Sequence, residues 1–212
     1  MRLGLKQDKG QAFPIYVVVV AGLLFAAFAF FAVGMASATR STAQGAADAA
    51  ALAAATDARD HLKPGLSLGL LKREDWEKLL KGELLDLEGA CGAASAFAGE
   101  NHASLQSCSV VLPRFEASVK TDKAVGESVV PGTSTMHGTA DAAAVIEPRC
   151  RLGDDPVDPG DGDDPPPGDD EDDDEPKPFD LKCKGGDVTF DPLNPDPWRE
   201  LAKLLFSVRL VD

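Results

Sequence analysis

The sequence lacks the short motifs that usually indicate enzyme chemistry. It has no GxSxG nucleophile turn, no GxGxxG run and no phosphate-binding P-loop. The three histidines, His61, His102 and His137, do not have metal-ligand spacing with one another, and there is no CxxC pair. We therefore expect a non-enzymatic protein that has no cofactor.

Basic residues are scarce beside acidic ones, with 21 Lys and Arg against 35 Asp and Glu and a net charge of −14. Segment 153–178 alone carries thirteen acidic residues and one lysine, so the rest of the chain is nearly neutral. No basic stripe is present to neutralise phosphates, which argues against a nucleic-acid partner. Rich in Pro and Gly as well, 153–178 predicts a disordered acidic linker. Ca²⁺ binding is the alternative, but EF-hand spacing is missing and we favour a solvated spacer.

Charged residues are absent from 11–39. Residues 14–36 would span roughly 34 Å as a helix, at about 1.5 Å per residue, enough for a bilayer core of about 30 Å. A buried helix of a soluble protein rarely hides so many apolar residues on every face. A cleaved signal peptide is the stronger alternative, because "GMASA" at 34–38 resembles a cleavage site. We favour an uncleaved, single-pass span in the lipid bilayer.

The charges that flank this span predict its orientation. Arg2, Lys6 and Lys9 precede it and only Arg40 follows closely. Because short positive flanks remain in the cytoplasm, we expect a cytoplasmic N-terminus and an extracytoplasmic C-terminal part.

Hydrophobic periodicity predicts an α+β fold: a long N-terminal transmembrane helix continuing into an Ala-rich helix, then helices packed on an antiparallel β hairpin or sheet. The helix should run from Phe13 to Asp60 and stop at Lys63-Pro64-Gly65. The expected regions are a basic leader (1–10), the span (11–39), an Ala-rich extension (40–63), a small ectodomain (64–152), the acidic linker (153–178) and a C-terminal segment with an amphipathic helix (179–212).

Within the ectodomain we expect helices over 76–87 and 92–105. Alternation of Phe115, Ala117 and Val119 with polar residues predicts a strand that starts near Cys108, with Pro113 at a bulge or an edge. Residues 136–146 alternate in the same way, so the two strands suggest an antiparallel hairpin. In the C-terminal segment, apolar residues from Trp198 to Val208 recur at helical spacing, and Asp196 is the expected cap.

Four cysteines, an even number placed outside the cytoplasm, predict two disulfides. A helix over 92–105 would hold Cys91 and Cys108 roughly 26 Å apart, well beyond the 4.4–6.8 Å that a disulfide needs. The hairpin would instead bring Cys108 towards Cys150. We therefore predict the pairs Cys108–Cys150 and Cys91–Cys183.

The N-terminal segment, "DKGQAFPIYVVVVAGLLFAAFAFFAVGMASATRSTAQGAADAAALAAA", resembles Tad-type (Flp) pilus-assembly proteins of the TadE/TadG kind. The resemblance rests on "GQ" before the span, Arg40 after it, and "QGAADAAALAAA". It implies a bacterial membrane protein that acts as a minor pilin-like subunit or an envelope anchor. Its partners would be other Tad-apparatus membrane proteins or pilus subunits. The alternative is a membrane-tethered extracytoplasmic interaction module unrelated to pili.

The same resemblance makes Gly10 and Gln11 a possible prepilin-peptidase processing site. In similar substrates the glycine is followed by four residues and then Glu-Tyr. Tyr16 keeps the tyrosine here, whereas Ile15 replaces the glutamate. A glutamate at that place is thought to help a subunit dock inside the membrane, so we favour an unprocessed, stationary anchor.

Small residues at four-residue spacing allow two interpretations of the long helix. The pairs Gly22/Ala26 and Gly34/Ala38 and the triplet Ala46/Ala50/Ala54 fit the pattern through which helices pack closely. In so alanine-rich a segment, the same pattern also arises from helix propensity alone.

Overall fold

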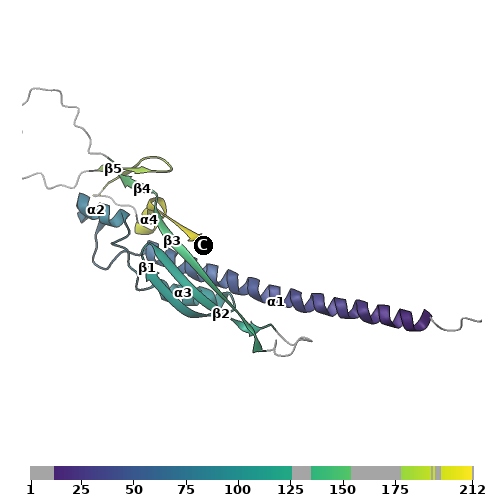
Figure 1. The fold of residues 1–212 in the computed structure, drawn as a ribbon. Helices are drawn as coiled ribbons and strands as arrows, with labels where there is room; N and C mark the ends of the chain where they lie inside the picture. The colour runs from purple at the N-terminus through teal and green to yellow at the C-terminus, as the bar shows by residue number, and fades with distance from the viewer. Residues whose placement is uncertain (1–11, 126–134, 154–177, 192, 194–196, 212) are drawn as a thin grey trace, which may run out of the picture.

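The computed structural model describes residues 12–125, 135–153, 178–191, 193 and 197–211. It is an α+β protein in which one helix, α1 (Ala12–Asp60), is far longer than any other element (Figure 1). This helix has 49 residues, so it is roughly 74 Å long at about 1.5 Å per residue. Alanine favours the helix along its second half, and Gly65, with φ of 84°, lies in the turn beyond its end. The predicted unbroken helix and its stop are confirmed.

A four-stranded antiparallel sheet packs against the second half of α1. Its strand order is β1-β2-β3-β7, built from β1 (Ala103–Val111), β2 (Arg114–Ala124), β3 (His137–Pro148) and β7 (Phe206–Val211). β2 and β3 pair as predicted, with Phe115 opposite Ala144 and Val119 opposite Ala140. The position of Pro113 was wrong: it lies in the tight turn between β1 and β2, after a cis Leu112–Pro113 peptide. Residues 108–120 therefore form a hairpin rather than one strand.

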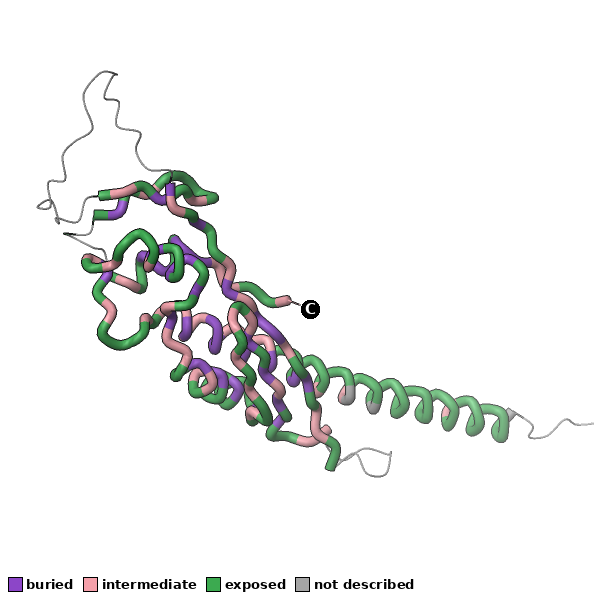
Figure 2. Tube along the Cα trace, turned by 60° about the vertical axis from the view of Figure 1, so that its left-hand side comes forward, coloured by how far each residue is buried: buried purple, intermediate pink, exposed green. Residues whose placement is uncertain are grey.

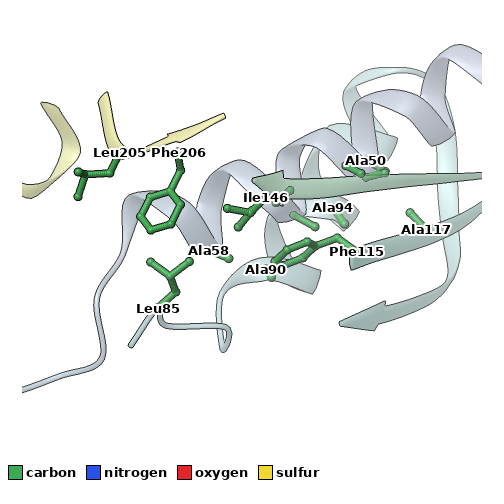
Figure 3. Close-up of a cluster of buried hydrophobic side chains, with 14 of the residues drawn as sticks. Ala50, Ala58, Leu85, Ala90, Ala94, Phe115, Ala117, Ile146, Leu205 and Phe206 are labelled. Atoms are coloured by element: carbon green, nitrogen blue, oxygen red, sulfur yellow. The ribbon is translucent and has the colours of Figure 1, made fainter. Parts of the chain in front are cut away.

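Alanine methyl groups fill most of the space between α1 and the sheet. Ala50 and Ala58 of α1 are fully buried and lie near Ala117 and Ile146 of the sheet (Figure 3). α3 (Ala90–Glu100) lies beside α1 and adds Ala94 to the same layer. Because the side chains are so short, helix and sheet approach closely, and even a small increase in side-chain volume should lower stability. Figure 2 shows that burial is confined to this half of α1.

The disulfide pairing that we predicted is wrong. The structure joins Cys91 to Cys108, with Cα atoms 5.8 Å apart, and Cys150 to Cys183. The helix predicted over 92–105 ends at Glu100, and His102, with φ of 59°, reverses the chain into β1. β1 therefore runs back along α3 and brings Cys108 beside Cys91.

A second, smaller sheet has the order β4-β5-β6, formed by β4 (Cys150–Leu152), β5 (Phe179–Cys183) and β6 (Val188–Phe190). It packs against α2 (Arg73–Leu80), which follows the short 3₁₀ turn η1 (Leu68–Leu70). Trp76 of α2 makes edge contacts with Phe179 and Phe190 at centroid distances of 5.1 and 4.5 Å. This sheet was not anticipated, because its strands are short and the acidic segment separates β4 from β5.

Two predicted helices are shorter than their apolar spacing suggested. α2 ends at Leu80, and Leu85 beyond it is buried in a β-bridge with Leu62. α4 (Trp198–Leu205) gives way at Phe206 to β7, which pairs with β3. The edge of the sheet offers this segment backbone hydrogen bonds that outweigh its helical periodicity.

Several expectations fall on residues outside the described ranges. They concern the basic leader, the acidic linker with its Ca²⁺ alternative, and the cap at Asp196.

Candidate membrane stem and assembly surface

The first half of α1 projects from the rest of the molecule as a bare apolar rod (Figure 2). We call residues 13–38 the stem and the remaining described residues the head. Phe13, Phe25 and Phe30 of the stem are 74, 76 and 80% exposed. So large an exposed apolar surface requires a covering phase or partner. Among the described helices, α1 is the one whose length and hydropathy suffice to cross a membrane.

The stem joins the head without a break in the helix. Thr39 and Thr42 follow the apolar run, and their hydroxyls donate to the carbonyl oxygens of Met35 and Ala38 on the preceding turn. Ala43, one residue later, is already fully buried in the head. A head that begins so soon after the apolar run lies directly at the end of the stem, with no linker between them.

At this junction the start of β3 packs closely against α1, at Gly138. A Cβ on Gly138 would lie 2.8 Å from the carbonyl oxygen of Thr39 and 3.2 Å from the Ala43 Cβ. Gly138 N–H donates to the hydroxyl of Thr121, which is buried and donates in turn to the Lys123 carbonyl oxygen at 2.8 Å. The absence of a side chain at Gly138 therefore permits helix and strand to meet at the base of the head.

The described end of α1 begins just after the possible processing site. Gly10 and Gln11 lie outside the described residues. Ile15 and Tyr16, which follow them, are 65 and 68% exposed on the first turns of the stem. No described residue packs over them, so this end of α1 is an open surface on the described part of the chain.

Small residues along α1 divide into two groups with different roles. Ala46, Ala50 and Ala54 are at most 1% exposed, because they pack inside the head of the same chain. This triplet therefore packs within the head and is not available as a surface between chains. Gly22 and Gly34 of the stem have no atom within 4 Å of the position that a Cβ would occupy, so their pairs with Ala26 and Ala38 remain open for helix packing.

The histidines take part in local backbone contacts. His137 Nδ1 lies 2.7 Å from the carbonyl oxygen of Thr121, and His61 Nδ1 lies 2.8 Å from that of Asp57. Within the described ranges, no three His, Cys, Asp or Glu side chains converge as a metal site.

Residues near the C-terminus contact the last turn of α1 and the edge of the main sheet, and both contacts stabilise the head. We did not predict these contacts from the sequence. Trp198 Nε1 donates to the Arg59 carbonyl oxygen at 3.1 Å, at the last turn of α1. In β7, Arg209 forms an ion pair with Glu147 of β3, and this hydrogen bond is the main reason why the pKa of the Glu147 carboxyl lies below its usual range. Alternation in "FSVRLV" was the signal for this strand.

Comparison with known protein families finds a match to part of the chain. Residues 10–57 match the family model described as "Putative Flp pilus-assembly TadE/G-like", which covers the stem and most of the part of α1 that enters the head. No curated protein and no solved structure matched the chain. The resemblance noted in the sequence is therefore confirmed for the N-terminal segment: residues 10–57 are similar to the TadE/G-like Flp pilus-assembly family.

Proposed function

We propose that this protein is a non-enzymatic, single-pass membrane component of a Tad-like Flp pilus assembly or secretion apparatus, and that it acts as a stationary anchor. The observation that carries the proposal is the form of α1. The segment similar to the pilus-assembly family is one continuous helix that is bare and apolar for half its length and forms the spine of a folded head for the other half.

This form suits a component that must hold a domain at a fixed place on a membrane. An unbroken helix carries orientation from the stem to the head, because a sharp kink between them would disrupt backbone hydrogen bonds. The close contact of Gly138 with Thr39 supports the head at the point where the stem leaves it. A head placed in this way presents its surfaces to other membrane components at a constant height.

Two observations favour a cytoplasmic N-terminus and an extracytoplasmic head. Lysines and arginines are concentrated in residues 1–10, before the stem. The head contains two disulfides, and these persist in oxidising compartments outside the cytoplasm. A C-terminal alkaline phosphatase fusion should therefore be active, whereas activity of a cytoplasmic reporter at the same place would contradict this orientation.

An anchor is favoured over a polymerising subunit because Ile15 stands where similar processed substrates carry a glutamate. The first test is the N-terminal residue and intact mass of native protein extracted from membranes. A chain that starts at Met1 supports a permanent anchor.

A start at Gln11 would instead show that the chain is processed and would indicate a pilin-like subunit. In that case the Gly10→Leu variant should abolish processing. A start between Ser37 and Thr39 would show a cleaved signal and overturn the membrane proposal. Genes for a secretion ATPase and a Tad membrane platform beside this gene would support the pilus role, and an isolated locus would favour an unrelated interaction module.

A further inference from the structure

Alternation along the β4–β5 ribbon gathers basic side chains on one of its faces. Cys150 pairs with Cys183, and Arg151 pairs with Lys182 directly opposite on the neighbouring strand. Beyond the ladder, Lys184 N–H donates to the Arg149 carbonyl oxygen at 2.9 Å. Since successive residues of a strand point to opposite faces, the disulfide lies on one face and the cations on the other. This face, which we call the basic face, carries four exposed basic residues, Arg149, Arg151, Lys182 and Lys184. Asp180, which alternates with Lys182 along β5, lies on the same face.

The basic face keeps a net positive charge in the described structure, because its four cations outnumber Asp180 and Asp187. Lys184 also interacts electrostatically with Glu147. Like charges directly opposite on adjacent strands are destabilising, and the ribbon places Arg151 beside Lys182. Lys182 is bonded to Asp187 at 2.6 Å. Arg149, Arg151 and Lys184 have no side-chain hydrogen bond or ion pair with any residue in the described ranges. The basic face therefore favours an anionic partner.

The location of the basic face narrows the choice of partner. It lines a shallow concavity of about 520 Å³ that includes Cys150, Cys183 and Asp187. β4 and β5 lie at the end of the head opposite to the stem (Figure 1). A face so far from the membrane-spanning helix is not placed to meet anionic lipid headgroups.

An anionic segment is attached to this ribbon at both ends. The acidic run leaves after β4 at Gly153 and returns to β5 at Phe179, and segment 153–178 carries thirteen acidic residues and one lysine. Gly153 N–H donates to the Asp180 carbonyl oxygen at 2.9 Å, which holds the two ends together. Arg73 of α2 adds a further cation there, donating to the Gly153 carbonyl oxygen at 2.8 Å.

We propose that the basic face is the docking site for the acidic run of the same chain, residues 154–177. The acidic run is long enough to reach the basic face, because an extended segment of this length spans up to roughly 80 Å at about 3.3 Å per residue. The basic face begins next to the points where the run is attached. Attachment gives the run a millimolar effective concentration over the ribbon, ahead of any free anion. Its high charge also repels other anions from the same place. The exclusion of lipid rests on the membrane anchorage in the proposed function, whereas the charge of the run and its attachment to the ribbon do not.

Cleavage before aspartate by endoproteinase Asp-N reports whether the run is docked. The full-length protein in a neutral detergent is digested at about 20 mM and about 500 mM NaCl, and mass spectrometry follows the first cuts within 154–177. Because exposed ion pairs are screened by salt, we expect cleavage roughly tenfold faster at high salt. The triple variant Arg149→Gln, Arg151→Gln, Lys184→Gln should be cut rapidly at both salt concentrations.

A matched triple variant, Lys81→Gln, Lys120→Gln, Lys123→Gln, removes as many exposed cations elsewhere on the head and should behave like the wild type. A small unstructured peptide with the same aspartates corrects for salt effects on the protease itself. If the corrected rate for the wild type does not change with salt, the proposal is overturned, even if the ribbon variant fails to fold.

Dilution separates the intended occupant from a second copy of the chain. Docking within one chain gives protection that is independent of protein concentration between about 0.1 and 10 µM, since effective concentration is set by the tether. Protection that disappears on dilution would assign the face to a neighbouring copy. Protection that requires added heparin would assign it to an external polyanion. Either of these results would overturn the proposal.

Discussion

Replacement of Gly138 by alanine tests the contact on which the junction of stem and head depends. The new Cβ would lie 2.8 Å from the Thr39 carbonyl oxygen, closer than carbon and oxygen can approach without a shift of backbone. Inserting a methyl group into so tight a site typically costs about 1–3 kcal/mol. Alanine also reduces the conformational entropy of the unfolded chain, which stabilises the folded state by about 0.4–1 kcal/mol. The expected net loss of folding free energy is about 1–2 kcal/mol.

This loss can be measured by thermal unfolding of the full-length protein in detergent, followed by near-UV circular dichroism of the head. For a protein of this size, about 1 kcal/mol corresponds to a Tm change of about 2–4 °C, so Gly138→Ala should lower Tm by about 2–8 °C.

The matched control is Gly45→Ala, one turn into the head on α1. Gly45 is exposed and has no atom within 4 Å of the position that a Cβ would occupy. Alanine is preferred to glycine in a helix by about 1 kcal/mol, so this variant should raise Tm by about 2–4 °C. If both variants raise Tm, β3 does not approach α1 as closely as described, and the rigid junction proposed for the anchor is refuted.

Three further predictions concern the bonds that close the head. Removing one disulfide with Cys91→Ser should lower the free energy of unfolding by about 3 kcal/mol. Non-reducing peptide mapping of the wild type should recover Cys91 joined to Cys108. Recovery of another pair would refute the arrangement of β1 beside α3. Trp198→Phe should cost about 1 kcal/mol in chemical denaturation, because the Arg59 carbonyl oxygen loses its donor, and an unchanged midpoint would show that water replaces it. The Glu147 carboxyl has a folded-state pKa below its unfolded value, so its stabilising effect is fully present above the usual glutamate pKa of about 4.3 and is lost as pH falls below that value through the lower folded-state pKa. The Tm difference between wild type and Glu147→Gln should therefore shrink on acidification, and a constant difference would argue against this ion pair.

Several elements were predictable because their signals are local. The alanine content of α1 predicts a helix, and the lack of charge in 11–39 predicts a candidate membrane span within it. Alternation around Phe115 and Ala140 specified two strands with a common buried face. The resemblance to pilus-assembly proteins was also visible, since it depends on the order of residues near Gly10 and Arg40.

Other features depended on contacts between distant residues. Apolar spacing alone predicted a helix up to residue 105, and this error led to the wrong disulfide pairs. It also predicted a C-terminal helix up to Val208, so β7 was missed. Backbone hydrogen bonds to a neighbouring strand decided both endpoints, and such partners are not encoded in the segment itself.

The sequence by itself therefore determined the long helix, the candidate span within it, the β2–β3 pair and the kind of family that the N-terminal segment resembles, because each rests on the chemistry of neighbouring residues. Only the tertiary structure decided which faces of α1 are free and which cysteines meet. It also showed that Arg149, Arg151 and Lys184 form one basic face, because strand pairing brings residues from both sides of the acidic run together.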